Sequence, residues 1–258
     1  MKVSIIIVDY RKASSVVANI KTLLKSDRNF DIEIIVLDNS ENQKNAEILQ
    51  KNLSKIPTVK LFIAPKNQGY TAGNNWAAKR ADGEILGIVN PDIAWNDSKA
   101  LSALVAYIQK NEEVGVVGPK QLDPNEKTVD TARKFPGFFE LIWRRIFPTR
   151  EKKLADKNAQ KVDWLQSSCI FLSRKLWDDI GGFDEKYFLF MGDVELCRDT
   201  WKRGKKVIFL PDAVVSTDGI RLSSGNVLDF FRKPVLRQHF YDAVKYFWSH
   251  KGQKKPSP

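Results

Sequence analysis

The chain has 258 residues, 43% of them hydrophobic, and a formal net charge of +11. That length and apolar content suit one large α/β domain or two small ones, and they exclude a disordered chain. No apolar run approaches the ~18 residues of a membrane-spanning helix, and residues 1–8 are typical of a strand rather than a signal sequence, because they lack a small-residue cleavage site. We therefore expect a cytoplasmic protein.

The first half of the sequence alternates predicted strands and helices with short connections. Apolar, β-branched runs bounded by turn residues indicate strands, and apolar residues at helical spacing indicate helices. The predicted strands are 3–8, 32–37, 59–63, 84–89 and 114–117, and the predicted helices are 14–26, 42–54, 71–81 and 98–110. Asp97 or Ser98 is placed to cap the last helix. Such a βαβα series predicts a mainly parallel sheet covered by helices on both faces.

The pattern changes between about 119 and 160, where a polar stretch contains one aromatic segment that we expect to be helical. Further along, the sequence predicts a strand at 169–172, a short helix opened by Ser173, a helix from Asp193 to Trp201, strands at 207–210 and 213–215, and a basic helical tail. Cys169 and Cys197 lie in apolar segments without the spacing of a metal cluster or a disulfide framework. We expect both cysteines in the core.

The basic excess is concentrated in clusters, two of which alternate with large apolar residues. These two are 138–153, with Arg144, Arg145, Lys152 and Lys153, and the tail from 230 to 255. An aromatic and basic segment is typical of an interfacial helix on an anionic membrane, but also of a helix that packs its aromatics inward and solvates its charges. For 138–147 both interpretations stay open, whereas for the last helix inward packing is slightly favoured. Nucleic-acid binding ranks lower, because the sequence has no helix-turn-helix, RNP or zinc pattern.

Polar turns follow the first three predicted strands. They are Asp9-Tyr10-Arg11, Asp38-Asn39-Ser40, and the small-residue turn from Asn67 to Asn75, which contains Gly69 and Asn74. Each turn alone is more often ordinary turn chemistry, since Gly, Asn and Asp favour turns for backbone reasons. Three of them at consecutive strand ends favour a nucleotide pocket, although the third turn is neither a Walker loop nor Gly-x-Gly-x-x-Gly.

Two acidic sites lie about a hundred residues apart. Asn90-Pro91-Asp92 directly follows an apolar strand that Pro91 ends, and Asp193-Val194-Glu195 lies within a long apolar segment. Open α/β sheets bind ligands at the carboxyl ends of their strands, so Asp92 should lie at such a mouth. One carboxylate could then hold a metal while the other accepts a proton. Simpler interpretations are a turn carboxylate for Asp92 and a helix N-terminal acid for Asp193.

Taken together in this order, the motifs resemble the inverting family 2 glycosyltransferases of the GT-A fold, in particular the bacterial rhamnosyltransferase branch that builds O-antigen and related glycans. The resemblance covers nearly the whole chain. The motifs are residues 3–10, 37–40, 67–75, 90–93, 133–136, 162–164, 181–185 and 193–197. The resemblance implies a Rossmann-like α/β domain with a nucleotide-sugar half at 1–118, an acceptor and catalytic half at 119–226, and a basic amphipathic tail at 227–258.

The resemblance also implies roles for individual residues. Tyr10 and Asp38 would hold the base, and Asp92 would bind Mg²⁺ or Mn²⁺ on the donor diphosphate. Asp193 would be the general base that takes the proton of the acceptor hydroxyl. The other donor-side residues would be Asp9, Asn39, Asn67, Gly69, Asn74 and Asn90, and the acceptor-side residues would be Trp164 and Glu195.

Two positions depart from the family pattern. Gly192 stands where the family usually has a Glu before the base, and the late segment 214–219 lacks the family's frequent His. His239 and His250 do not fit that position. Asp218 is therefore an alternative oxygen ligand, or else Asp92 and the diphosphate hold the metal alone.

The sequence thus predicts a membrane-associated cytoplasmic enzyme that transfers a sugar, L-rhamnose from dTDP-rhamnose, to a lipid-linked saccharide. One alternative is an enzyme that uses a UDP-hexose. Another is a non-catalytic module that binds a nucleotide sugar or an anionic polymer.

Overall fold

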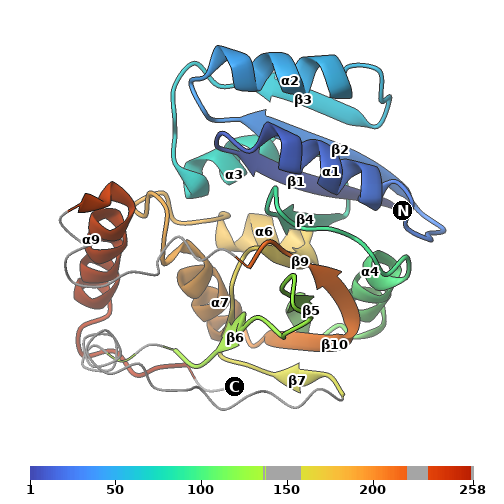
Figure 1. Cartoon of the computed structure of the whole chain (residues 1–258). Helices are drawn as coiled ribbons and strands as arrows, with labels where there is room; N and C mark the ends of the chain where they lie inside the picture. Colours follow the sequence, from blue (N-terminus) through green and yellow to red (C-terminus); the bar gives the residue numbers. More distant parts are fainter. Residues whose placement is uncertain (136, 138–157, 220–231, 257–258) are drawn as a thin grey trace.

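The computed structural model describes residues 1–135, 137, 158–219 and 232–256. Its strands are β1 (Lys2–Asp9), β2 (Asp31–Asp38), β3 (Val59–Ile63), β4 (Ile85–Val89), β5 (Val114–Leu122), β6 (Ala132–Arg133), β7 (Gln160–Lys161), β8 (Trp164–Leu165), β9 (Cys169–Ser173) and β10 (Lys206–Ser216). Its helices are α1 (Ala13–Leu23), α2 (Gln43–Leu53), α3 (Tyr70–Ala78), α4 (Ala100–Lys110), α6 (Arg174–Ile180), α7 (Gly192–Lys202) and α9 (Pro234–Ser249) (Figure 1). The predicted aromatic helix at 138–147 lies outside the described residues.

One eight-stranded sheet, in the order β3-β2-β1-β4-β9-β5-β10-β7, forms the centre of the molecule. The pairs β3-β2, β2-β1, β1-β4 and β5-β10 are parallel, which confirms the predicted mainly parallel α/β sheet. The strand β9 runs antiparallel to both β4 and β5. It therefore starts at the edge where β4 ends, and brings a later part of the chain to the ends of the early strands.

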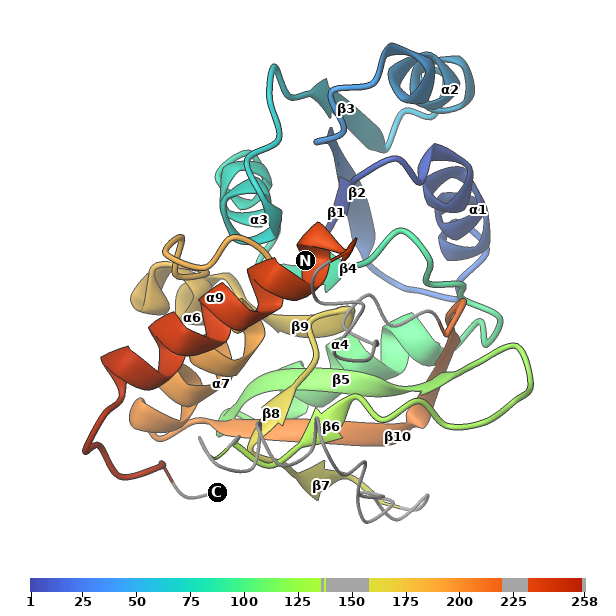
Figure 2. The same cartoon turned by 60° about the vertical axis from the view of Figure 1, so that its left-hand side comes forward.

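Helices cover both faces of the sheet, as the sequence predicts. Alternate residues of β1 point to opposite sides: Ile5 and Ile7 pack with the layer of α1, α2 and α4, and Ile6 packs with the layer of α3, α6 and α7. Figure 2 shows α1 and α3 on opposite sides of β1 and β2. Cys169 and Cys197 are buried and free, as predicted for core residues.

The helix starts confirm one predicted cap and contradict another. The side chain of Ser173 accepts a hydrogen bond from the backbone N–H of Leu176 at 3.1 Å, so it caps α6 as predicted. The prediction for α4 is wrong, because its N-cap residue is Lys99, which makes no side-chain cap. Asp97 instead forms a turn with the N–H of Lys99, and the hydroxyl of Ser98 donates to Asp27.

The two strands predicted at 207–210 and 213–215 form a single strand in the structure. The strand β10 runs through 207–210 and 213–215, with a register shift between Leu210 and Val214. Its end places Thr217 and Asp218 near the mouth of the sheet. The helix α9 follows later in the chain, and both views show it on the side of the molecule that carries α7 (Figures 1 and 2). The predicted tail helix began at 227, and 227–231 lie outside the described residues.

Candidate functional site

The carboxyl ends of β1, β2 and β4 meet at one edge of the sheet. Asp9 and Asp38 lie opposite each other in the parallel register of β1 and β2. The backbone N–H of Asn90, directly after β4, donates to the carbonyl of Ser168 at 2.7 Å. This bond joins the segment that carries Asp92 to the segment that begins β9.

Asp38 and Ser40 each have a buried polar atom at the end of β2 that is unpaired among the residues the structure describes. Both residues are buried, and one oxygen of Asp38 accepts the N–H of Ser40 at 3.0 Å. Within the described residues, the second oxygen, Oδ2 of Asp38, and the hydroxyl of Ser40 have no hydrogen-bond partner. Buried polar atoms are rarely left unpaired, so these two atoms mark a place where a ligand could donate or accept a hydrogen bond.

Asp9 and Tyr10 differ in orientation although they are neighbours. Asp9 is fully buried and accepts hydrogen bonds from the N–H of Lys12 at 2.8 Å and the side chain of Asn45 at 2.6 Å. Burial raises the pKa of Asp9, and these bonds partly oppose that effect. The ring of Tyr10 is 51% exposed. Asp9 therefore shapes the turn, while Tyr10 is available to a ligand.

The amides of the predicted donor turn hold the turn itself together. The side chain of Asn39 donates to Asn67 at 3.0 Å and to the carbonyl of Gly69 at 2.9 Å. Gly69 has φ of +82°, and a Cβ there would lie 2.5 Å from the carbonyl oxygen of Phe188. Asn74 donates to the carbonyl of Tyr70 at 2.8 Å. These residues line the edge of the sheet, and their contact with a donor stays a prediction.

A second group of charges forms where β1, β4 and β10 end. The ammonium group of Lys12 lies 2.9 Å from a carboxylate oxygen of Asp218 and 4.0 Å from one of Asp92. The hydroxyl of Thr217 donates to the other oxygen of Asp92 at 2.5 Å. Asp92 and Asp218 are 126 positions apart in the chain, and the fold places both beside one cation.

The donor set of this group fits a hard divalent cation. Within the described ranges, no three His, Cys, Asp or Glu side chains form a cluster of the kind that encloses a metal ion. Asp92 and Asp218 offer carboxylate oxygens, which Mg²⁺ and Mn²⁺ prefer, and Mg²⁺ sites commonly combine one or two carboxylates with substrate phosphates. The position of Lys12 between the two acids shows that this place already holds a positive charge.

Asp193 is the second residue of α7 and is half-buried at the same edge. Its carboxylate accepts the N–H of Ser167 at 3.3 Å and its neighbour Val194's N–H at 2.9 Å. Burial raises the pKa of Asp193, while the two N–H groups and the charge of Arg133 lower it. A carboxyl group with a raised pKa is a better proton acceptor than an ordinary aspartate.

Tyr70 connects the two acidic sites. Its hydroxyl donates to the carbonyl of Ser167 at 2.9 Å, next to the N–H that Asp193 accepts. Burial raises the pKa of Tyr70, and the charges of Asp193 and Asp92 both raise it further. The two carboxylates therefore act on the same phenol group. The structure brings together the two sites that the sequence separates by about a hundred residues.

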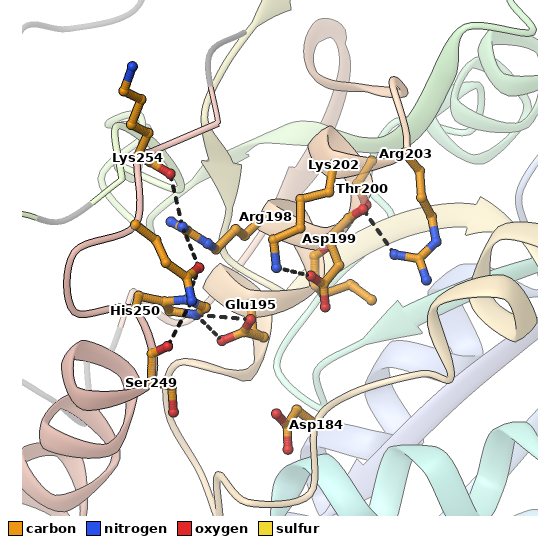
Figure 3. A network of polar contacts seen from close by, with 12 residues as sticks. Asp184, Glu195, Arg198, Asp199, Thr200, Lys202, Arg203, Ser249, His250 and Lys254 are labelled. Carbon is orange, nitrogen blue, oxygen red and sulfur yellow. Dashed lines mark hydrogen bonds and ion pairs between the residues drawn. The ribbon is translucent and has the colours of Figure 1, made fainter.

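The predicted acceptor-side residues make contacts within the protein. Glu195 is buried and accepts a hydrogen bond from the hydroxyl of Tyr187 at 2.8 Å. It also accepts one from the imidazole of His250 at 2.8 Å (Figure 3). The indole N–H of Trp164 donates to the carbonyl of Lys134 at 2.9 Å. Glu195 thus ties the residue after α9 to α7, and the acceptor role of both residues stays a prediction.

Three residues of this edge received no role of their own from the sequence, although Tyr70 and Arg133 lie within the motifs 67–75 and 133–136. Lys12 lies beside Asp92, Tyr70 connects the acids, and Arg133 acts electrostatically on Asp193. The basic residue directly after the first strand's polar turn was an available signal for Lys12. The positions of Tyr70 and Arg133 follow from tertiary packing.

Comparisons with known proteins identify the family of this chain. Residues 4–181 match the family model described as glycosyl transferase family 2. An N-acetylglucosaminyl-diphospho-decaprenol L-rhamnosyltransferase of Mycobacterium tuberculosis is 27% identical over 208 residues, which are 71% of this chain and 66% of that protein. The O-antigen biosynthesis protein RfbC of Myxococcus xanthus is 31% identical over 80% of this chain and 16% of its own length. The chain therefore spans just under two thirds of the mycobacterial relative.

A solved structure shares the fold. The mannosyltransferase PcManGT from Pyrobaculum calidifontis, in complex with GDP-Man and Mn²⁺, superposes with a TM-score of 0.64 at 19% identity, covering 94% of this chain and 64% of that one. The arrangement of strands and helices described above is therefore that of a known enzyme fold.

Proposed function

Because the chain belongs to glycosyl transferase family 2, we propose that it transfers L-rhamnose from dTDP-rhamnose to a lipid-linked saccharide, with inversion at the anomeric carbon. The observation that carries the proposal is that residues 167–168 join the two acidic sites at the strand-end edge of the sheet: Ser168 accepts the N–H of Asn90, two residues before Asp92, and Ser167 donates its N–H to Asp193. The mycobacterial relative, named as a rhamnosyltransferase acting on a decaprenol diphosphate sugar, supports the choice of donor and acceptor.

The base of the donor would bind between Tyr10 and Asp38. The N3–H of thymine or uracil is a donor, and the unpartnered Oδ2 of Asp38 is the acceptor that it requires. The exposed ring of Tyr10 offers a surface for stacking, which is typical of base recognition by aromatic side chains. Thymine and uracil share this hydrogen-bonding edge, so Asp38 does not by itself choose between a dTDP and a UDP donor.

The diphosphate would lie beside Lys12, Asp92 and Asp218. A divalent cation held by the two carboxylates would neutralise charge that develops on the departing nucleotide diphosphate. Lys12 is placed to contribute a further positive charge to the same phosphate oxygens, since its ammonium group already lies between the acids. The solved mannosyltransferase contains Mn²⁺, which supports divalent metal use in this fold.

Asp193 would act as the general base. Its carboxylate would take the proton of the acceptor hydroxyl as that oxygen attacks the anomeric carbon and the bond to the diphosphate breaks. The N–H groups of Ser167 and Val194 hold the carboxylate in place. A single displacement inverts the anomeric carbon.

The lipid-linked acceptor implies work at the inner face of the cell membrane. No helix among the described residues has the length and apolar character needed to cross a bilayer. We propose peripheral association through basic and aromatic segments. The segment 138–153, which is a candidate for this contact from the sequence, lies outside the described residues.

A donor screen tests the enzyme proposal. Hydrolysis or transfer is measured with dTDP-rhamnose and with UDP-hexoses, each in the presence of Mg²⁺ or Mn²⁺. Turnover of dTDP-rhamnose supports the proposal, turnover of a UDP-hexose alone replaces the donor, and binding without turnover indicates a binding module.

Calorimetry with the Asp92→Ala variant tests the metal assignment. The variant should lose turnover and most of its metal-dependent nucleotide binding while the fold stays intact. Unchanged metal-coupled binding would remove Asp92 from the site.

A further inference from the structure

The helix α9 has a different chemistry on its two sides. Its inner side buries Leu236, Asp242, Ala243 and Tyr246 against the protein. Its outer side exposes Phe240 at 51%, Tyr241 at 61%, Val244 at 43% and Trp248 at 78%. In the part of the chain that the structure describes, these are four of the eight exposed large hydrophobic side chains. The exposed apolar surface is therefore concentrated on one helix.

Within the described segment 232–256, which contains α9, the exposed charged side chains are all positive. Phe240, Val244 and Trp248 follow one another at i, i+4 and i+8, so they form a continuous stripe along the helix. The basic residues of the segment 232–256 are all exposed: Arg232, Lys233, Arg237, Lys245, Lys251, Lys254 and Lys255. The one acidic residue in the same segment is Asp242, which is completely buried.

We propose that α9 is an interfacial helix that binds an anionic lipid surface through Phe240, Tyr241, Val244 and Trp248. An amphipathic helix of this composition lies in the plane of the membrane interface, with its apolar side chains among the acyl chains and its cations at anionic headgroups. A second copy of the chain is a poorer partner, because it would bring another basic helix to a protein of net charge +11.

The inner side fixes α9 to the loop that leads to Asp193. The carboxylate of Asp242 accepts hydrogen bonds from the backbone N–H groups of Phe188, Leu189 and Phe190 at 3.3, 3.1 and 2.9 Å. Just beyond the helix, His250 contacts Glu195 on α7 (Figure 3). The helix that would lie on the lipid is thus held both to the loop before α7 and to Glu195 in the first turn of α7, which also carries Asp193.

This geometry would place the reacting edge beside the lipid surface, so the inference deepens the proposed transfer to a lipid-linked acceptor. The role of lipid binding in catalysis rests on the proposed function, whereas lipid binding by α9 does not. The binding itself is measured without donor or acceptor, so a failure of the enzyme proposal would leave the result for α9 unaffected.

The experiment is vesicle flotation with the full chain. Vesicles contain phosphatidylcholine alone or with about one third phosphatidylglycerol, and the variant is Phe240→Ser combined with Trp248→Ser. Burying an aromatic side chain in an apolar phase is favourable enough that the double variant should lose about a hundredfold in lipid partition. The matched control is Ile63→Ser, which removes another exposed apolar side chain, 45% exposed, from the edge strand β3.

A second pair of variants tests the charges. Lys251→Glu with Lys254→Glu should weaken binding to the anionic vesicles, whereas Lys44→Glu with Lys51→Glu, on α2, should have little effect. Wild-type binding should weaken as salt rises from about 0.1 M to about 1 M, because exposed charges are screened. Melting curves confirm that each variant is folded.

Tryptophan fluorescence gives a readout that a folding defect would not imitate. Trp248 is the most exposed of these residues, so its emission should shift to shorter wavelength when vesicles are added. Trp248→Phe should bind while losing most of that shift. Flotation of the Phe240 and Trp248 double variant at the wild-type level would overturn the proposal. Equal binding to neutral vesicles at all salt concentrations would overturn its anionic part.

Discussion

The hydrogen bonds between Asp242 and the loop before α7 predict that loss of the Asp242 carboxylate lowers both stability and activity. Asp242 is completely buried, and its two oxygens accept three backbone N–H groups and the side-chain amide of Gln238. Asp242→Ala removes this acceptor and leaves the loop N–H groups of 188–190 without a partner inside the protein. We expect the loop to loosen, and α9 to loosen with it.

The size of the effect follows from the contacts. A hydrogen bond to a charged group contributes about 1.5–3 kcal/mol, but the loop is partly exposed and water can replace some of the lost bonds, so we assign about 1 kcal/mol to each N–H. The three bonds then give a loss of roughly 3 kcal/mol in the free energy of unfolding. For a domain of this size that corresponds to a fall in Tm of about 6–12 °C.

The loop continues through Met191, a non-glycine residue with φ of +67°, into the turn that holds Asp193. We therefore expect kcat of Asp242→Ala to fall about tenfold or more, with a smaller change in the KM for the donor. The kcat of Asp242→Asn should lie between those of Asp242→Ala and the wild type, because the amide nitrogen of Asn would face backbone N–H groups in place of one carboxylate oxygen.

Thermal melting and steady-state kinetics measure both effects. The control is Asp179→Ala, which removes a surface carboxylate that is 50% exposed and pairs with Lys175, so it should change Tm by about 1 °C or less. A Tm and a kcat of Asp242→Ala within error of the wild type would show that other contacts hold the loop.

Three further variants test the site. Asp193→Asn should reduce transfer by roughly 10²–10⁴-fold with little change in donor affinity, and wild-type transfer should fall as pH falls through a pKa above the ordinary aspartate value, because the base must be ionised. The Tm of Asp193→Asn at neutral pH should not be lower than that of the wild type, because a raised pKa means that folding disfavours the ionised Asp193 carboxyl group. A marked loss of Tm in Asp193→Asn would contradict this. Lys12→Met should tighten Mn²⁺ binding in the absence of nucleotide, measured by electron paramagnetic resonance, because Asp92 and Asp218 lose a competing cation; unchanged Mn²⁺ binding would separate Lys12 from the metal. Gly192→Ala should lower Tm, because a Cβ there would lie 2.6 Å from the methyl group of Thr71; a Tm equal to that of the wild type would show that α3 and α7 can separate.

The sequence was sufficient for the parallel part of the fold. Strands such as 3–8 and 32–37 are continuous runs of Ile, Val and Leu, and only a strand buried on both faces favours such a run. The direction of β9 could not be read in the same way, because an apolar run has the same composition in either direction. The two-residue strands β6, β7 and β8 are too short to give any periodic signal.

The sequence predicts the acidic residues of the candidate site but not the residues that contact them. Asp92 and Asp193 were found because each follows or begins a regular element. The partners of Asp92 are Lys12 and Thr217, and such distant residues meet only through the order of the strands. Similarly, the amide of Asn39 is a candidate ligand group in the sequence, whereas the fold directs it at Asn67 and Gly69. Local chemistry identifies a residue type, but only tertiary packing decides where its polar atoms point.

Gly192 shows how packing changes the meaning of a departure from the family pattern. From the sequence alone, a glycine in place of Glu is a lost contact with donor or acceptor. In the structure, Gly192 begins α7 against Thr71 of α3, and Thr71 also donates a hydrogen bond to the carbonyl of Tyr187. The close approach of these two helices uses the space that a side chain would need. The glycine is therefore part of the packing that places Asp193, and a Glu at this position would displace α7 from α3 instead of restoring a ligand contact.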